Sequence, residues 1–239
     1  MQHTVKAFDE DITQLRGLIA EMGGLAQLSV TEAITALETG DNELAKKVRK
    51  RDAKINALEA EIDRLAVRLI ALRAPMADDL REVVAALKIS GVLERIGDYA
   101  KNIAKRIGKI EGRKHFEPLT LIPAMGELAG EMVHDVLDAF AARDAARAKE
   151  IIARDDKVDA FYDSIFRNVV THMVENPQTI GTAAQMLFIA RNIERIADHA
   201  CNVAEQVYFA ATGNTLMEDG GHDHDAQMAD DRDSHEDED

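Results

Sequence analysis

Residues 87–107 read LKISGVLERIGDYAKNIAKRI, and residues 187–207 read LFIARNIERIADHACNVAEQV. Aligned without a gap, the two stretches share Leu, Ile, Glu-Arg-Ile, Asp, Ala, Asn and Ala in the same register. In each stretch the apolar residues recur every three or four positions, which is typical of an amphipathic helix. A likeness at a constant offset indicates an internal repeat. The sequence therefore predicts one helical unit that occurs twice.

A second pair of matching segments extends the repeat toward the start of each unit. Arg51-Asp52-x-Lys54 corresponds to Arg154-Asp155-x-Lys157, and Pro75 and Pro177 interrupt the two copies at nearly the same point. We expect six long helices, at about 4–38, 42–73, 76–111, 124–142, 144–175 and 178–212. The predicted fold is all-α, with two tandem three-helix-bundle repeats at 1–112 and 124–215, a linker at 113–123 and a disordered acidic tail at 216–239.

Composition and charge restrict the possible classes of protein. Hydrophobic residues make up 46% of the 239 residues, which is enough for a sizeable core. The single cysteine, Cys201, allows no intrachain disulfide and fits a reducing compartment. No stretch is apolar enough to span a membrane and the N-terminus lacks the pattern of a secretory signal, so we expect a cytoplasmic protein. The net charge is −15, of which residues 217–239 carry −10, and this acidity argues against a nucleic-acid partner.

The third helix of each unit carries polar residues at a spacing of four. Glu94, Asp98 and Asn102 stack on a face roughly opposite the apolar one. Acids at this spacing repel each other, so we expect something positive over them, and a metal ion is one candidate. Carboxylate and amide oxygens suit magnesium, manganese, calcium or iron. The candidate metal ligands are Glu94, Asp98, Asn102 and Asp52 in the first unit, and Glu194, Asp198, Asn202, Asp155 and Asp159 in the second.

A simpler interpretation of these acids stays open at this point. A charged face opposite an apolar stripe is what any surface helix shows, and Arg95 can neutralise Asp98 from three residues away. The base-rich end of the first unit's third helix, which includes Lys101 and Lys105, is open in the same way. It indicates either a site for an acidic partner or lipid headgroups, or a solvated helix end that the helix dipole favours.

Two stretches resemble the acidic motifs of the PhoU family, namely residues 93–104, LERIGDYAKNIA, and residues 193–202, IERIADHACN. Members of this family are bacterial accessory regulators of phosphate transport. Residues 73–81, RAPMADDLR, resemble the segment ahead of the first motif. The likeness implies a six-helix, two-repeat fold with divalent or trivalent metal ions, iron or zinc in relatives, on surface carboxylates. By position, Glu94, Asp98, Glu194 and Asp198 match the acidic motif in full.

The middle helices match the family less evenly than the third helices do. Asp155 and Asp159 match the acidic motif in the second unit. In the first unit Asn56 stands where a second carboxylate would follow Asp52, which leaves that site one charge short. The resemblance therefore implies a weaker metal site in the first unit than in the second.

The resemblance also implies partners and a role in the cell. It implies a cytoplasmic negative regulator of phosphate uptake and phosphate-starvation signalling. Such a regulator contacts the ATPase subunit of the phosphate ABC importer and a phosphate-sensing histidine kinase, and reaches the membrane only through them. A homodimer is expected from the family and because most soluble oligomers are symmetric homo-oligomers.

The sequence contains none of the common enzyme motifs for phosphate loops, dinucleotide binding, nucleophile elbows or zinc proteases. We therefore predict a regulator that acts by protein contacts and carries out no turnover. Two alternatives remain at this level. One is a carboxylate-bridged helical-bundle metalloenzyme, which would enclose its metals inside the bundle. The other is a metal-independent helical adaptor whose acids form a docking surface.

Overall fold

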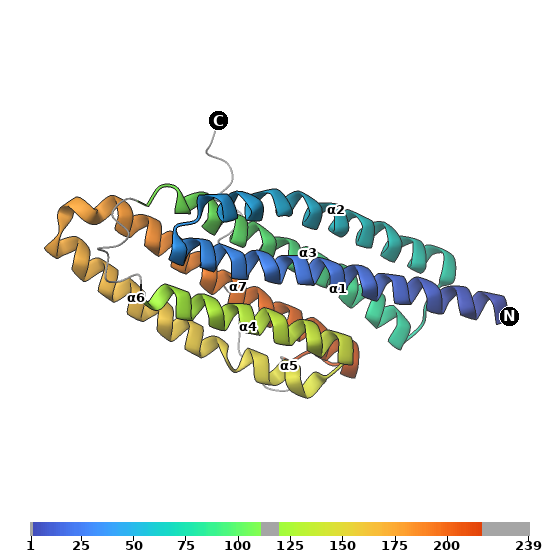
Figure 1. Ribbon diagram of the computed structural model, residues 1–239. Coiled ribbons are helices and arrows are strands. Elements are labelled where there is room, and N and C mark those ends of the chain that lie inside the picture. The colour runs from blue at the N-terminus through green and yellow to red at the C-terminus, as the bar shows by residue number, and fades with distance from the viewer. Residues whose placement is uncertain (1, 111–119, 217–239) are drawn as a thin grey trace.

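The computed structural model describes residues 2–110 and 120–216, and in residues 2–7 it describes the backbone alone. These described residues form helices and turns without a strand, as Figure 1 shows. The helices are α1 (Gln2–Thr39), α2 (Asn42–Arg73), α3 (Asp78–Ile107), α4 (Leu121–Ala142), α5 (Ala145–Ile152), α6 (Asp155–Glu175) and α7 (Ile180–Thr212), with a short 3₁₀ helix, η3 (Pro177–Thr179), before α7. The predicted all-α fold with two helical repeats is confirmed.

The same residue type starts the second helical segment of each repeat. The Asp41 carboxylate accepts hydrogen bonds from the backbone N–H groups of Glu43 and Leu44, at 2.9 and 3.0 Å. Asp144, 103 positions later, accepts from the two equivalent groups at 3.0 Å before α5. An aspartate at this position satisfies backbone donors that the first helical turn leaves open. The repeat is therefore visible in local chemistry as well as in sequence.

The second repeat differs from the prediction in its middle helix. The expected helix at about 144–175 is interrupted at Ala153 and Arg154, so α5 and α6 together take the place of α2. The interruption puts Asp155 and Asp156 in the first turn of a helix, where backbone N–H groups favour negative charge.

The boundary between the repeats also differs from the prediction. α4 begins at Leu121, inside the expected linker, because Pro123 is tolerated in a first helical turn and the Ile122 side chain is buried. Residues 111–119 of the linker and 217–239 of the acidic tail lie outside the described residues.

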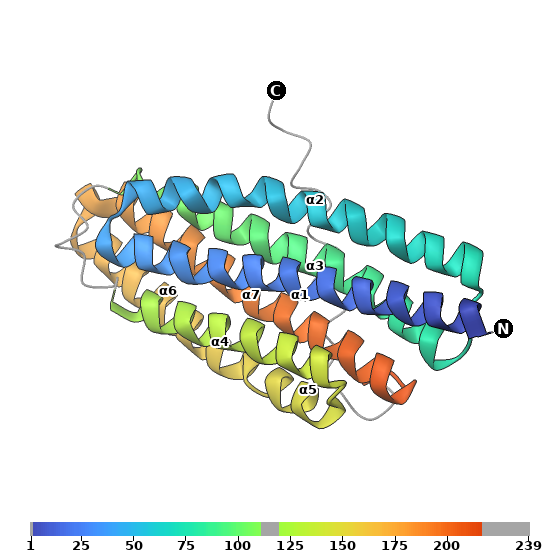
Figure 2. The same ribbon diagram turned by 45° about the vertical axis from the view of Figure 1, so that its right-hand side comes forward.

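The two repeats pack through α3 against α7 and through α1 against α4, as Figures 1 and 2 show from two directions. Gly23 of α1 faces Leu137 of α4, and Gly126 of α4 faces Ile34 of α1, each so closely that an added Cβ would overlap the opposite side chain. At the repeat offset of 103 residues, Gly23 corresponds to Gly126 and Ile34 corresponds to Leu137, so each contact is the counterpart of the other. The repeats therefore face each other about a local two-fold axis.

A buried carboxylate also joins the repeats. Glu82 of α3 is 6% exposed and accepts a hydrogen bond from Arg16 of α1 at 2.8 Å. Arg143, which follows α4, approaches the same carboxylate at 3.3 Å. A buried acid requires such partners, because an isolated charge is costly to remove from water. Within the described helices, none is long and apolar enough to cross a lipid bilayer.

Candidate functional site

The acids predicted from the first repeat meet along the seam between α2 and α3. The Lys101 ammonium donates hydrogen bonds to Asp52 Oδ2 on α2, at 3.0 Å, and to Asp98 Oδ1 on α3, at 2.6 Å. Asn102 donates its amide N–H to Asp98 Oδ2 at 3.2 Å, and its oxygen accepts from Lys105 at 3.2 Å. The structure therefore brings together three of the predicted ligands, but with a protein ammonium already between two of them.

Burial and crowding of like charge characterise this first seam. Burial raises the pKa of Glu94, and the negative charges of Glu59, Asp98 and Asp52 raise it further. Burial likewise raises the pKa of Glu59, with a contribution from Asp63. Asp52 Oδ1 is buried and makes no hydrogen bond with any described residue. The seam thus holds more negative charge than Lys101 alone neutralises.

Lys101 remains an ammonium in this setting. Burial lowers its pKa, but the hydrogen bonds to Asp98 and Asp52 outweigh burial and leave the pKa raised. The side chain is 22% exposed. A fixed positive charge therefore lies where the two carboxylates would otherwise share a cation.

The second repeat gathers its acids along the seam between α6 and α7. Asp155 of α6 is 4% exposed and Glu194 of α7 is 9% exposed. Burial raises the pKa of Glu194, Arg191 lowers it, and Asp198 and Asp159 raise it again. Arg191 donates a hydrogen bond to Glu194 Oε2 at 2.5 Å. Asn202 lies one turn beyond Asp198 on α7 and is half-buried.

Cys201 takes the position in α7 that Lys101 takes in α3, and it is 3% exposed. Burial raises the pKa of its thiol, and the charges of Asp155, Asp198, Glu205 and Asp159 raise it further. Burial and these charges therefore favour the protonated form of the thiol. Four carboxylates therefore act on a position where the first repeat has an ammonium.

An arginine fixes the first acid of each seam. Arg51 pairs with Glu32 of α1 at 2.6 Å, immediately before Asp52. Arg154 pairs with Asp135 of α4 at 2.5 Å, immediately before Asp155. Because each arginine reaches back to the first helix of its own repeat, the next side chain along α2 or α6 is directed toward α3 or α7. The matching ion pairs position the two acids alike.

The chain matches known proteins over most of its length. The PhoU domain family matches it twice, at residues 19–107 and 122–207. The chain belongs to the PhoU family. A phosphate-specific transport system accessory protein PhoU homolog of Zymomonas mobilis is 51% identical over 216 residues, covering 90% of this chain and 91% of that protein. The PhoU accessory protein of Escherichia coli K12 is 36% identical and covers 95% of each chain.

Solved structures agree with this membership. The crystal structure of PhoU from Pseudomonas aeruginosa superposes with a TM-score of 0.83 at 36% identity, covering 87% of this chain and all of that one. The phosphate transport system regulatory protein PhoU from Streptococcus pneumoniae superposes with a TM-score of 0.82 at 29% identity, covering 87% of this chain and 98% of that one. Both matches include the two repeats that carry the acid seams.

The acids of this PhoU chain lie deeper than a polar surface stripe would place them. The Asp98 side chain is 39% exposed, but those of Asp52 and Glu194 are 14% and 12% exposed. The reason is the position of α3 and α7, each of which packs against helices of both repeats. A helix covered on several sides leaves few of its residues in free solvent.

A protein cation contacts the predicted metal ligands in both seams: Lys101 bonds to Asp52 and Asp98 in the first, and Arg191 bonds to Glu194 in the second. Oxygen donors in excess of positive charge are a suitable ligand set for hard cations. In the first seam Lys101 occupies the space between Asp52 and Asp98, so a metal ion would have to displace it. No three His, Cys, Asp or Glu side chains are already arranged as a metal site within residues 8–110 and 120–216. The metal site therefore stays a prediction.

Glu59 joins the first seam although the acidic motif does not include it, and in the sequence it is marked by its spacing of four to Asp63. In the second repeat Tyr162 takes that place, with Arg191 5.7 Å from the centre of its ring. Burial and the nearby Glu194 raise the pKa of Tyr162.

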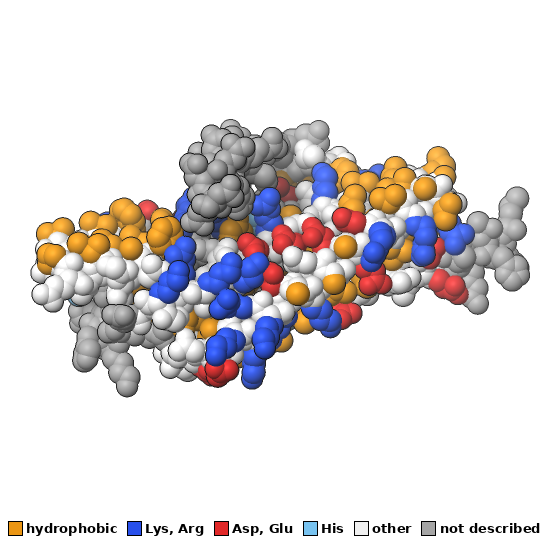
Figure 3. All heavy atoms as spheres, turned by 90° about the horizontal axis from the view of Figure 1, so that it is seen from above, with side chains coloured by type: hydrophobic (Ala, Val, Ile, Leu, Met, Phe, Trp, Pro, Cys, Tyr) orange, Lys and Arg blue, Asp and Glu red, His pale blue; other side chains and the backbone are white. Residues whose placement is uncertain are grey.

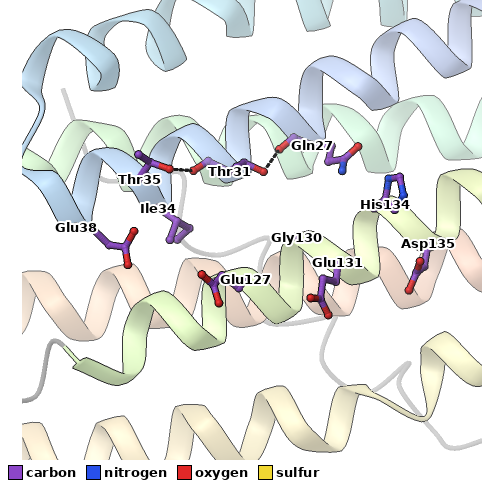
Figure 4. A pocket seen from close by; sticks show the side chains of 11 residues that line it. Gln27, Thr31, Ile34, Thr35, Glu38, Glu127, Gly130, Glu131, His134 and Asp135 are labelled. Atoms are coloured by element: carbon purple, nitrogen blue, oxygen red, sulfur yellow. Dashed lines mark hydrogen bonds between the residues drawn. The ribbon is translucent and has the colours of Figure 1, made fainter.

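A hollow also lies away from both seams, between α1 and α4 (Figure 4). It has a volume of about 470 Å³ and is lined by Thr31, Glu38, Glu127 and Glu131, among others. It adjoins the close contact of Gly126 with Ile34. Glu131 and His134 of this lining form a single Glu-x-x-His in the sequence, whereas ferritin-like di-iron bundles need that motif twice.

Proposed function

We propose that this protein is an accessory regulator of a phosphate transport system. The observation that carries the proposal is the match, over nine-tenths of both chains, to a relative described as a phosphate-specific transport system accessory protein. Both repeats and both acid seams lie inside the matched region. The role proposed is therefore that of the whole protein and not of a single domain.

The more specific form of the proposal concerns partners. The protein acts in the cytoplasm as a negative regulator of phosphate uptake and of phosphate-starvation signalling. It contacts the ATPase subunit of the phosphate ABC importer and a phosphate-sensing histidine kinase, and it functions as a homodimer. The partly exposed carboxylates of the seams offer charged groups for such contacts, and charge complementarity favours fast and selective association.

Binding, without turnover, is the activity that the site supports best. A carboxylate-bridged metalloenzyme encloses its metals inside a helical bundle and keeps an open coordination position for substrate. Here the acids lie along seams between pairs of helices, and Asp98 is still 39% exposed. This placement favours a regulatory ion or a docking contact over a buried reaction centre.

We further propose that the second seam holds a divalent or trivalent metal ion. The ligands would be Asp155, Asp159, Glu194 and Asp198. A bound cation would neutralise their mutual repulsion, tie α6 to α7, and offer a positive centre to an anionic group of a partner. In the first seam Asp52, Glu94, Asp98 and Asn102 would bind metal more weakly, because Lys101 competes for the same oxygens.

Deletion of the gene tests the regulatory role. With phosphate in excess, the deleted strain is expected to express a phosphate-starvation reporter and to take up labelled phosphate faster than its parent. The full-length gene supplied on a plasmid should restore both readings. If reporter and uptake stay at the parental level in the deleted strain, the proposal is wrong.

Elemental analysis distinguishes the metal-bound regulator from the metal-independent adaptor. The purified protein is compared with a variant carrying Asp155→Asn, Asp159→Asn, Glu194→Gln and Asp198→Asn. Stoichiometric metal in the parent alone supports the metal site. Loss of binding to the importer's ATPase subunit in the variant, with no metal in either protein, favours the adaptor.

A further inference from the structure

A basic cleft lies beside the first seam, between the start of α2 and the end of α3. We define the basic cleft by its five cationic residues, which are Lys46, Arg49, Lys50, Lys101 and Lys105; Asp52 also lines it. Its volume is about 410 Å³. In Figure 3, Lys and Arg side chains gather next to acidic ones near the middle of the face seen from above.

The protein itself neutralises only part of this positive charge. Lys46 pairs with Glu43 at 2.7 Å, and Lys101 pairs with Asp52 and Asp98. Arg49 and Lys50 are exposed and have no ion pair with any described residue. Among the described residues, Lys105 bonds to the neutral amide of Asn102 and to no carboxylate. Cations this close together repel one another, and a bound anion would offset that repulsion.

The cleft is an exception within an acidic molecule. The chain has a net charge of −15, yet five cations and one carboxylate line this hollow. The second repeat has no counterpart, because the equivalent positions hold Lys149, Ile152, Ala153, Cys201 and Glu205. Lys149 is instead placed 4.7 Å from the centre of the Tyr208 ring. The positive charge is therefore a property of one repeat and not of the fold.

The number of charges indicates the kind of ligand. With Lys46 paired to Glu43 and Lys101 paired to Asp52 and Asp98, three cleft cations remain without a carboxylate partner among the described residues. A single phosphate group carries about −1.5 to −2 charges at neutral pH and neutralises these three only in part. Among the described residues that line the cleft none is aromatic, so these residues offer no stacking surface for a nucleobase. We propose that the basic cleft binds an anion with two or more phosphate groups, either a free oligophosphate or a lipid headgroup that carries two phosphates. The proposal rests on these side chains and not on the regulatory role.

Lys101 links this cleft to the acid seam. Its ammonium lines the cleft and also bonds to Asp52 and Asp98. A bound polyphosphate competes with the two carboxylates for that ammonium and weakens its hold on them. Anion binding in the cleft therefore favours cation binding in the seam, and by linkage the reverse also holds.

The test is titration of the full-length protein with sodium tripolyphosphate by calorimetry at low salt, with orthophosphate and sulfate alongside. Tripolyphosphate should bind at least about tenfold more tightly than orthophosphate, and its affinity should fall as salt is added. The variant Lys50→Gln/Lys105→Gln removes two cleft cations and should weaken tripolyphosphate binding by at least about tenfold. Folding of each variant is checked by circular dichroism.

The matched control is Lys88→Gln/Lys157→Gln, which removes the same charge from exposed lysines outside the cleft. It should bind tripolyphosphate like the parent. Equal loss in both variants, or binding by the parent of neither tripolyphosphate at millimolar concentration nor cardiolipin vesicles, overturns the proposal. Vesicles with and without cardiolipin separate the two sources. Lysine-dependent binding to cardiolipin vesicles alone assigns the cleft to a lipid headgroup, and binding of free tripolyphosphate assigns it to a soluble anion.

Discussion

The two acid seams use equivalent helices but place their positive charges at opposite ends. In the first, Lys101 lies between Asp52 and Asp98, and position 91 is a glycine with no side chain to bond to Glu94. In the second, Cys201 replaces the lysine, and Arg191 stands at the position of the glycine and bonds to Glu194. Three carboxylates correspond in the two repeats, at Asp52 and Asp155, Glu94 and Glu194, and Asp98 and Asp198, whereas the positive charge lies at different positions. The two seams therefore present different arrangements of charge within one chain.

The largest expected effect concerns Glu82, whose counterpart in the second repeat is Thr182. The double variant Arg16→Ala/Arg143→Ala leaves a buried carboxylate without its two arginines. We expect the free energy of unfolding to fall by about 3 kcal/mol, measured by urea denaturation. Arg68→Ala, which removes an exposed pair with Asp11, should cost less than about 1 kcal/mol. Equal losses would mean that the buried acid does not hold the repeats together.

A second prediction removes the main difference between the seams. Lys101→Ala frees Asp52 and Asp98 and should raise the affinity of the first seam for manganese by about tenfold, as measured by calorimetry. Lys105→Ala removes a nearby charge that does not touch the carboxylates, and a smaller gain is expected. If both variants bind manganese equally, Lys101 is not the competitor that the geometry indicates.

A third prediction probes the two-fold contact between α1 and α4. Gly126→Ala should destabilise the protein by about 1 kcal/mol or more, because the new methyl group meets Ile34, which is stiff at χ1. Gly23→Ala meets the tip of Leu137, which can rotate, and the gain in helix propensity should offset the overlap. Thermal unfolding of both variants measures the difference in stability. A larger loss for Gly23→Ala than for Gly126→Ala would contradict the prediction.

The smallest expected effect is a dependence on pH. Burial and the charges of Glu59, Asp98 and Asp52 raise the pKa of Glu94 in the folded protein. An acid of this kind makes the folded state less stable as pH rises from its unfolded pKa through its folded pKa. Glu94→Gln should therefore raise the free energy of unfolding by a few tenths of a kcal/mol near neutral pH and by nothing at about pH 4.

Glu194→Gln is the matched comparison for that pH effect. Burial also raises the pKa of Glu194, but this carboxylate accepts a hydrogen bond from Arg191 that the glutamine would weaken. The gain at neutral pH should therefore be smaller than for Glu94→Gln. Urea denaturation at both pH values measures the gain in free energy of unfolding for each variant. A larger gain for Glu194→Gln than for Glu94→Gln would contradict the prediction.

Sequence periodicity was sufficient to predict where the long helices lie and which acids share a seam. It did not show the break at Ala153 and Arg154, because neither residue is a glycine or a proline. It also placed the acids on a surface, since a helical wheel does not show how many neighbours α3 and α7 acquire when the repeats pack. Lys101 was assigned to a basic helix end, and only its distance to Asp52 on another helix shows its second contact.

The exchange of glycine and branched side chain across α1 and α4 has a consequence for the protein's ancestry and design. An interface related by a two-fold axis is one that a single repeat can form with an identical copy. Joining two such copies in one polypeptide removes the requirement that they stay identical. A lysine can then be kept in one half and a cysteine in the other. The two repeats thus resemble the two different subunits of a heterodimer, and because they are joined in one chain they are always present in equal number.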